Sequence, residues 1–92
     1  MRNYEFTLIL SSDDDKMKEG LELVTKAFEK YGVVITKQED MGVKPLAYLI
    51  KKQDTGHYVY FEIEADTTVV KQISRDFQLS TLVLKYLFIS KN

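Results

Sequence analysis

The stretch that decides the fold is residues 42–64, GVKPLAYLIKKQDTGHYVYFEIE. Two runs rich in aromatic and β-branched residues flank a polar connector at residues 52–56, and this pattern predicts a β-hairpin in which Gly56 supplies a positive φ to the loop. In the second run, apolar residues alternate with tyrosines and carboxylates: Val59, Phe61 and Ile63 against Tyr58, Tyr60, Glu62 and Glu64. Because successive side chains of a strand point to opposite faces, we expect one buried sheet face and one tyrosine-bearing face.

The residues before this stretch predict a strand and then a helix. Residues 4–10 alternate in the manner of a half-buried strand. Residues 11–15, SSDDD, then offer hydroxyl and carboxylate caps to the free amides of a helix start. An apolar stripe at steps of three and four predicts the helix itself, with Gly32 as its stop, and consists of Met17, Leu21, Val24, Phe28 and Tyr31.

A long arm rich in β-branched residues leads into the hairpin. It spans residues 33–52, which is longer than an average strand. Gly42 and Pro45 predict a bend or bulge, because proline cannot donate to a β-ladder, and they place this strand at an edge of the sheet. The shift in register leaves open the face taken by Leu46, Tyr48 and Ile50.

A second helix and a last strand follow the hairpin. Residues 66–68, DTT, predict a capped helix start, and the apolar side of that helix carries Val69, Val70, Ile73 and Phe77. Residues 82–89 are apolar on both faces, so we expect a central or covered strand there. The order strand, helix, strand, strand, helix, strand predicts an α+β protein of the ferredoxin-like split βαβ fold. It forms one domain over residues 1–92, a four-stranded antiparallel sheet with both helices on one face.

The other face of this sheet is expected to be open. Its expected members are Glu5, Thr7, Ile9, Tyr58, Tyr60, Glu62, Lys85, Leu87 and Ile89. Because monomers seldom expose a large contiguous apolar patch, this face implies a surface for a partner.

Composition limits the kind of partner and compartment. The chain is 45% hydrophobic and 29% charged, which is typical of a globular domain, and the absence of cysteine excludes disulfides and fits a reducing compartment. Thirteen basic and fourteen acidic residues give a net charge of −1, so any contact with RNA must be local. The apolar run at residues 6–10 is too short and mixed for a secretory signal or a membrane span, and we expect no membrane association.

Catalytic and metal-binding patterns find little support. His57 has no cysteine to act on and is interpreted as an exposed surface residue. The aspartates at residues 13–15 lack the glycine and closing glutamate of a calcium loop, which favours helix capping over a metal. Base stacking on Tyr58 and Tyr60 is disfavoured relative to a protein-facing surface, because these aromatics are out of step with the RNA-recognition motif. We expect no enzyme activity, no metal and no cofactor.

Several motifs resemble those of the sixth protein of the bacterial small ribosomal subunit. They are MRNYE at residues 1–5, YG at 31–32, GVKPLAYLIKK at 42–52 and GHY at 56–58. The resemblance implies a structural, non-catalytic protein of the ribosomal platform in the cytoplasm. It also implies binding to the central domain of 16S rRNA, and a heterodimer with small-subunit ribosomal protein eighteen formed from a chain that is a monomer when isolated.

Site residues follow from the same resemblance. It implies RNA contact at Arg2, Tyr4 and Lys44, and charge and strand position add Lys85 and Lys91. Partner contact is expected at Tyr48, Tyr58, Tyr60 and Leu87. Pro45 stands where the family typically has the second residue of a basic pair, so this chain lacks one of the cationic side chains that the resemblance implies there.

The competing interpretation is a ferredoxin-like dimerisation or small-molecule-sensing domain that uses the open face for self-association. An acylphosphatase-like enzyme ranks third, because it would need an arginine in the first loop, where this chain has SSDDD.

Overall fold

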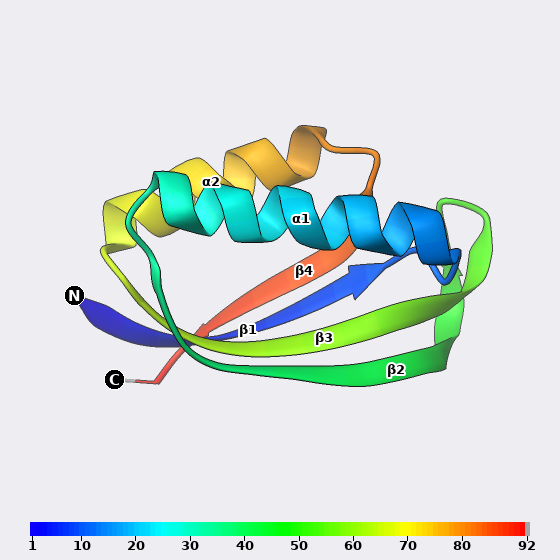
Figure 1. Ribbon diagram of the computed structural model, residues 1–92. Coiled ribbons are helices and arrows are strands. Elements are labelled where there is room, and N and C mark those ends of the chain that lie inside the picture. Colours follow the sequence, from blue (N-terminus) through cyan, green and yellow to red (C-terminus); the bar gives the residue numbers. More distant parts are fainter. Residues whose placement is uncertain (92) are drawn as a thin grey trace.

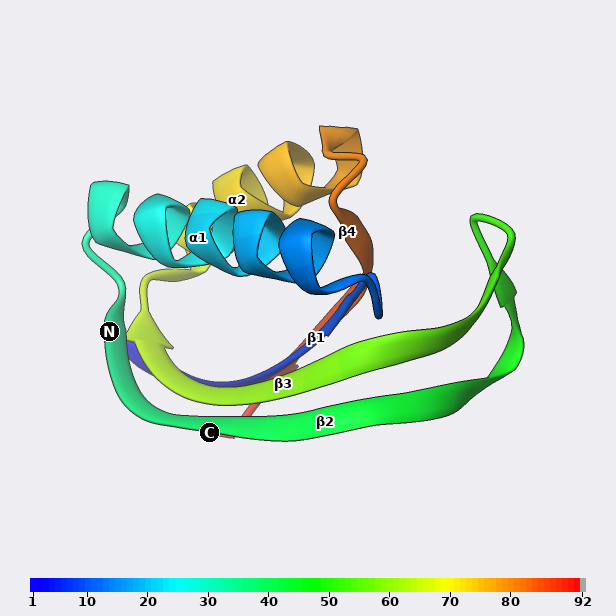
Figure 2. The same cartoon turned by 45° about the vertical axis from the view of Figure 1, so that its right-hand side comes forward.

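The computed structural model describes residues 1–91, and its elements follow the predicted order (Figure 1). The strands are β1 (Arg2–Leu10), β2 (Val34–Ile50), β3 (Gln53–Ala65) and β4 (Val83–Ser90), and the helices are α1 (Asp14–Lys30) and α2 (Thr67–Leu79). The sheet has the order β2-β3-β1-β4 with antiparallel neighbours. Both helices lie on the same side of it in two views (Figures 1 and 2). The α+β, ferredoxin-like fold is therefore confirmed.

The core lies between the sheet and the helices and is dominated by phenylalanine. The ring centroid of Phe6 on β1 lies 5.4 Å from that of Phe28 on α1, 5.6 Å from that of Phe61 on β3 and 5.8 Å from that of Phe77 on α2. All four side chains are fully buried. Since the alternation in β1 and β3 sends these residues to the helix side, the opposite face keeps the polar residues.

The first helix is capped at both ends as predicted. Asp13 Oδ1 accepts hydrogen bonds from the amides of Asp15 and Lys16, both at 3.1 Å. Gly32 takes a φ of 71° just after the helix, and the Val33 amide donates to the Phe28 carbonyl.

The start of α2 is where predicted, but its cap differs. Asp66 occupies the N-cap without a side-chain hydrogen bond to the helix amides. The hydroxyl of Thr67 instead lies 3.3 Å from that of Tyr4, so this polar side chain ties the helix to β1.

The hairpin turn is tighter than the sequence suggested. Lys51 and Lys52 form it with φ values of 50° and 65°, and Ile50 pairs with Gln53 across it. Because two-residue hairpins need positive φ at both central positions, the lysines take the place assigned to Gly56. The prediction for Gly56 is wrong: it lies within β3, where a β-carbon would come 2.5 Å from Ile9 Cγ2, so the glycine is needed for close packing.

The two edge strands give opposite outcomes. The prediction that β2 lies at an edge is confirmed, and Gly42 bends it with a φ of 78° at a register shift. The expectation of a central or covered last strand is wrong, because among residues 1–91 β4 pairs with β1 alone and ends the sheet. Its helix side, with Tyr86 and Phe88, packs on the core, whereas Leu87 and Ile89 on its other side remain 53% and 48% exposed. Apolar residues on both faces therefore do not require cover on both.

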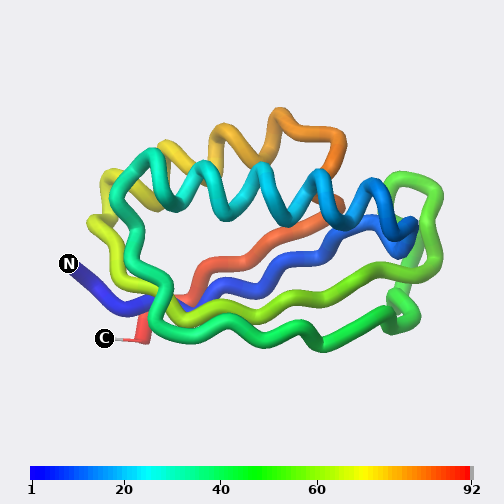
Figure 3. Tube along the Cα trace, viewed as in Figure 1, coloured from blue at the N-terminus to red at the C-terminus, as the bar shows by residue number. Residues whose placement is uncertain are grey.

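The end of the β2–β3 hairpin bends toward the layer of the helices (Figures 1 and 3). The ammonium of Lys51 at its tip donates to the carbonyls of Val83, at 2.9 Å, and Ser80, at 3.2 Å. The tip of the hairpin is thereby tied to the segment that opens β4.

Candidate functional site

Side chains on the face opposite the helices form rows that cross all four strands. The strand register gives three rows, written from β4 to β2: Lys85, Ile9, Tyr58 and Gly42; then Leu87, Thr7, Tyr60 and Glu39; then Ile89, Glu5, Glu62 and Lys37. The first row lies toward the hairpin and the third toward the chain termini. The nine residues predicted to share the open face do share it.

Lysines and tyrosines pair at the hairpin end of this face. We call Lys44, Tyr48, Tyr58 and Lys85 the hairpin-end patch. The ammonium of Lys44 lies 5.7 Å from the ring centroid of Tyr58, and that of Lys85 lies 5.4 Å from the ring centroid of Tyr48. Lys85 also donates to the Tyr48 hydroxyl at 2.7 Å, a hydrogen bond that raises the pKa of Lys85. Tyr48, whose face the sequence left open, thus meets a lysine that points away from the helices.

Carboxylates gather at the other end. We call Glu5, Tyr60, Glu62, Lys37 and Lys91 the acidic cluster. Glu5 stands directly opposite Glu62, and the Tyr60 hydroxyl donates to Glu5 at 2.7 Å and to Glu62 at 3.2 Å. The Lys91 ammonium lies 2.9 Å from Glu62, and that of Lys37 lies 3.9 Å away. The tyrosine proton and the two ammonium groups thus reduce the repulsion between facing carboxylates.

These contacts lower the pKa of Glu62 and raise the pKa values of Tyr60 and Lys91. The hydrogen bond from Lys91 lowers the pKa of Glu62 below its ordinary value. The hydrogen bond to Glu5 raises the pKa of Tyr60 well above the ordinary value of a tyrosine. The end of the face near the termini therefore keeps an ionised Glu62 and a protonated Tyr60 over the physiological pH range.

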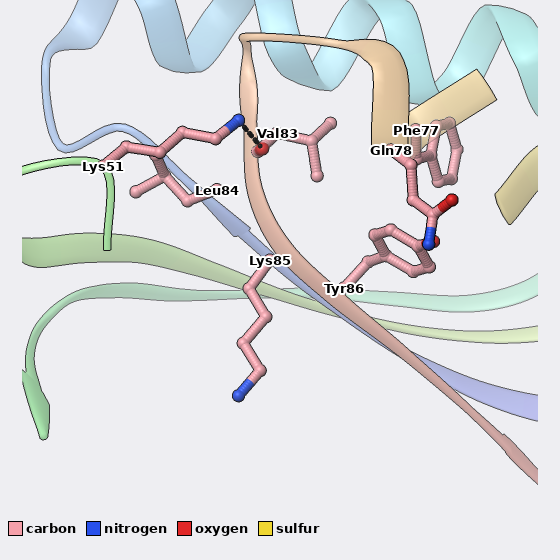
Figure 4. A pocket seen from close by; sticks show the side chains of 7 residues that line it. All are labelled: Lys51, Phe77, Gln78, Val83, Leu84, Lys85 and Tyr86. Atoms are coloured by element: carbon pink, nitrogen blue, oxygen red, sulfur yellow. Dashed lines mark hydrogen bonds between the residues drawn. The ribbon is translucent and has the colours of Figure 1, made fainter. Parts of the chain in front are cut away.

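Two hollows lie beside β4. The larger, of about 420 Å³, is lined by Lys51, Phe77, Gln78, Val83, Leu84, Lys85 and Tyr86 (Figure 4). The smaller, of about 190 Å³, lies on the open face and is lined by Thr7, Ile9, Lys85, Tyr86 and Leu87. Ile9 was predicted to belong to the exposed surface, but only 8% of it is exposed, because neighbouring side chains surround it.

The five candidate RNA-binding residues do not form one patch. Lys44 and Lys85 belong to the hairpin-end patch, whereas Arg2 opens β1 at the opposite end and Lys91 lies beside Glu62. The seven-residue step along β1 from Arg2 to Ile9, which pairs with Lys85, spans about 24 Å at ~3.4 Å per residue.

Tyr4 does not join the surface residues. It is 7% exposed, and its ring packs edge-on against Phe88 with the centroids 6.3 Å apart. The even-numbered residues of the middle of β1 face the helices, which places this side chain in the core. We therefore do not carry the expected RNA contact of Tyr4 into the proposal below.

His57 was interpreted as exposed, and this was wrong. Its side chain is 12% exposed and its Nε2 lies 2.7 Å from Asp40 Oδ1, which also accepts the Gly42 amide at 2.8 Å. The Gly42 amide and then His57 lower the pKa of Asp40. This contact fastens the bend in β2 to β3, and it gives the histidine a structural partner.

Sequence reasoning missed the Glu5–Tyr60–Glu62 contact as a unit. Glu5 and Tyr60 are 55 positions apart, and only the register of β1 on β3 brings them together. The available signal was the shared parity of these residues in two alternating strands.

Within residues 1–91, no cluster of three or more histidine or acidic side chains is arranged to hold a metal ion. No helix of that part of the chain combines the length and the apolar character needed to cross a membrane.

Comparison with known proteins gives a consistent family. The sequence profile described as Ribosomal protein S6 matches residues 3–90. Small ribosomal subunit protein bS6 of Treponema denticola is 38% identical over 89 residues, covering 97% of this chain and 96% of that protein. The crystal structure of 30S ribosomal protein S6 from Thermotoga maritima superposes with a TM-score of 0.86 at 22% identity, covering 98% of this chain and 87% of the other.

The fold alone is shared more widely. The solution structure of the C-terminal domain of the MgtC protein from Mycobacterium tuberculosis gives a TM-score of 0.65 at 8% identity, with 98% of this chain and 87% of that one covered. The two structural matches show the fold, and the sequence matches carry the family.

Proposed function

This chain belongs to the ribosomal protein S6 family, and we propose that it binds 16S ribosomal RNA in its central domain as a heterodimer with small-subunit ribosomal protein eighteen. It is a structural protein of the small ribosomal subunit, located on the ribosome in the cytoplasm, and it is not an enzyme. The observation that carries this conclusion is the family match over residues 3–90, nearly the whole chain.

The hairpin-end patch suits RNA. Its two ammonium groups lie over tyrosine rings, which orients them, and neither forms a salt bridge within residues 1–91. Lysines in this setting contact phosphates and fix the register of a protein on folded RNA, while the shape of the RNA provides most of the selectivity. We place Lys44 and Lys85 in this contact, with Arg2 reaching RNA at the other end of the sheet. Lys91 was also expected to contact RNA, but its ammonium pairs with Glu62 in the acidic cluster, so we do not place it in this contact.

The acidic cluster suits a basic protein. The facing carboxylates of Glu5 and Glu62 repel phosphates and attract cationic side chains, so this end of the face favours a protein partner. Tyr60 lies in the same row as Leu87, which adds exposed apolar surface. Tyr48 and Tyr58, also expected at the protein interface, contact Lys85 and Lys44, and we place them where RNA and partner meet.

Salt dependence of RNA binding tests the lysine and arginine assignments. With the partner present, Arg2→Ala plus Lys44→Ala should weaken binding to the 16S central domain and lower the slope of log K against log salt by about 2, one for each lost phosphate contact. The matched control is Lys18→Ala plus Lys71→Ala, which removes two exposed lysines from the helices. If both doubles give the wild-type slope in filter binding, these RNA contacts are wrong.

Oligomeric state separates this function from the self-associating alternative. Size-exclusion chromatography should show the isolated chain as a monomer, and addition of ribosomal protein eighteen should convert it to a heterodimer. A stable homodimer that ignores the added protein would favour a dimerisation domain.

A further inference from the structure

The outer edge of β4 is a row of backbone groups that faces away from the sheet. The Lys91 amide donates to the Asn3 carbonyl at 2.9 Å, which fixes the phase of the β1–β4 ladder. Because hydrogen-bonding groups alternate along an antiparallel strand, the odd-numbered residues 85, 87 and 89 turn theirs toward β1. The amides and carbonyls of Tyr86, Phe88 and Ser90 therefore point outward, where the described part of the chain forms no further strand.

The edge of β2 differs in that it carries features that discourage pairing. Its register shifts at three places, Gly42 bends it with a φ of 78°, and Pro45 has no amide proton to offer. Natural sheets use such bulges and prolines to prevent another strand from adding to an edge. Residues 86–90 of β4 contain no proline. The one register shift between β4 and β1 lies at Leu84, before this segment begins.

The two hollows described above lie on opposite faces beside the same strand. The larger hollow is lined from the helix side by Phe77 and Tyr86, and the smaller one from the open side by Ile9 and Leu87. Figure 4 shows Phe77, Gln78 and Tyr86 on one side of β4, with Lys85 pointing to the other. Since the side chains of an extended segment alternate between two faces, hollows on both sides of an edge fit an added strand.

We propose that an extended, mainly apolar segment of ribosomal protein eighteen adds to β4 as a fifth strand and places successive side chains in these two hollows. This proposal rests on the heterodimer of the proposed function, and it adds the way in which β4 holds the partner protein. Lys51 lines the larger hollow, and its ammonium donates to the carbonyl of Val83, another lining residue, which disfavours a basic side chain there. The cationic part of the partner faces the acidic cluster instead.

A second copy of this chain fits the edge less well. The rings that its β4 would offer on the helix side already pack internally: Tyr86 lies 5.7 Å from Phe77 and Phe88 lies 4.5 Å from Phe6 between ring centroids. They cannot fill the larger hollow of a neighbour without leaving their own core.

Amide hydrogen exchange of the ¹⁵N-labelled chain, alone and with unlabelled ribosomal protein eighteen, tests the proposal. The amides of Tyr86, Phe88 and Ser90 should exchange at least about tenfold more slowly in the complex, because each gains a hydrogen-bond partner. If the heterodimer forms and these amides keep their free exchange rates, the added strand is wrong and the proposed function stands. If no heterodimer forms, both fail. Protection by the RNA alone would also overturn the added strand.

A proline at position 90 gives a second test. Ser90 is exposed and its amide points outward, so Ser90→Pro removes a donor to the partner and leaves the bonds to β1 in place. The heterodimer dissociation constant should rise by about two- to tenfold, as expected for one hydrogen bond. Ser90→Ala keeps the amide and should bind as wild type. Urea midpoints should match, which shows that both variants are equally stable. If Ser90→Pro and Ser90→Ala then bind ribosomal protein eighteen with equal affinity, the proposal is overturned.

Discussion

The two ends of the open face use the same residue type for opposite purposes. At the hairpin end, Tyr58 offers its ring to the ammonium of Lys44. Two residues further along β3, Tyr60 offers its hydroxyl proton to Glu5 and Glu62. The difference teaches that a chain with a net charge of −1 separates its charge along the strands of one sheet. In the proposed function, one end then meets a polyanion and the other a basic protein.

Both ends rest on one core, and a core change should affect them equally. Phe61 lies between Tyr60 and Glu62 in sequence but points to the helix side, fully buried. Phe61→Ala should lower the free energy of unfolding by about 3–5 kcal/mol, through lost burial and the cavity left behind. Urea denaturation measures it. Leu87→Ala, an exposed control, should stay within about 0.5 kcal/mol. A loss below about 1 kcal/mol for Phe61→Ala would contradict the common core.

Gly56→Val should disturb the packing at the hairpin end and be detected by urea denaturation. A β-carbon at Gly56 would meet Ile9 Cγ2 at 2.5 Å and Leu46 Cδ2 at 3.3 Å, so the larger side chain must displace both. We expect a loss of about 1–3 kcal/mol in the free energy of unfolding. Asp54→Val, on the exposed part of the same strand, is the control. Equal stabilities of the two variants would show that the hairpin does not pack against Ile9.

The ionised carboxylate of Glu62 in the acidic cluster should affect how the thermal midpoint decreases at acidic pH. The pKa of Glu62 is lowered, chiefly by the hydrogen bond from Lys91. A lowered folded-state pKa stabilises the fold above the unfolded pKa, about 4.3 for glutamate, and this contribution is lost as the pH falls through the folded value. Glu62→Gln should therefore flatten the decrease of the thermal midpoint between neutral and acidic pH. A variant with the wild-type acid limb would contradict the Lys91 contact.

The smallest effect is spectroscopic and separates the two tyrosines. The pKa of Tyr60 is raised, chiefly by its hydrogen bond to Glu5, so its contribution to stability is complete below the ordinary pKa of 10.0 and is lost as the pH rises above it. In an ultraviolet titration, the last tyrosine to ionise in the folded chain should disappear in Tyr60→Phe and persist in Tyr58→Phe. If the last ionisation instead persisted in Tyr60→Phe and disappeared in Tyr58→Phe, the hydrogen bond from Tyr60 to Glu5 would be contradicted.

Much of the fold could be predicted because local pattern decides it. Alternation in β1 and β3 fixed which side is buried, and the stripe through Val24 and Phe28 fixed the helix side of the core. The position of β4 could not be read in this way, because an edge strand with one packed and one exposed apolar side has the composition of a buried strand. The hairpin turn was misplaced because lysines rarely take the positive φ seen at Lys51 and Lys52.

The candidate site was predictable as a face but not as a set of contacts. Strand parity alone puts Tyr58, Tyr60, Lys85 and Leu87 on one side of the sheet. Predicting the contact between Lys85 and Tyr48 requires knowing the path of the curved hairpin. Register shifts near Pro45 determine that path. The facing of Glu5 and Glu62 requires the register of two strands that are not neighbours in sequence.

A pair of charge reversals tests the division of the open face most directly. We predict that Lys44→Glu weakens binding of the heterodimer to the 16S central domain, measured at saturating partner, and leaves the affinity for ribosomal protein eighteen unchanged. Glu62→Lys should do the opposite in calorimetric titration, weakening the heterodimer while RNA binding at saturating partner persists. If both charge reversals weaken the same binding reaction, either RNA binding or heterodimer formation, and leave the other unchanged, the two ends of the face do not have separate roles.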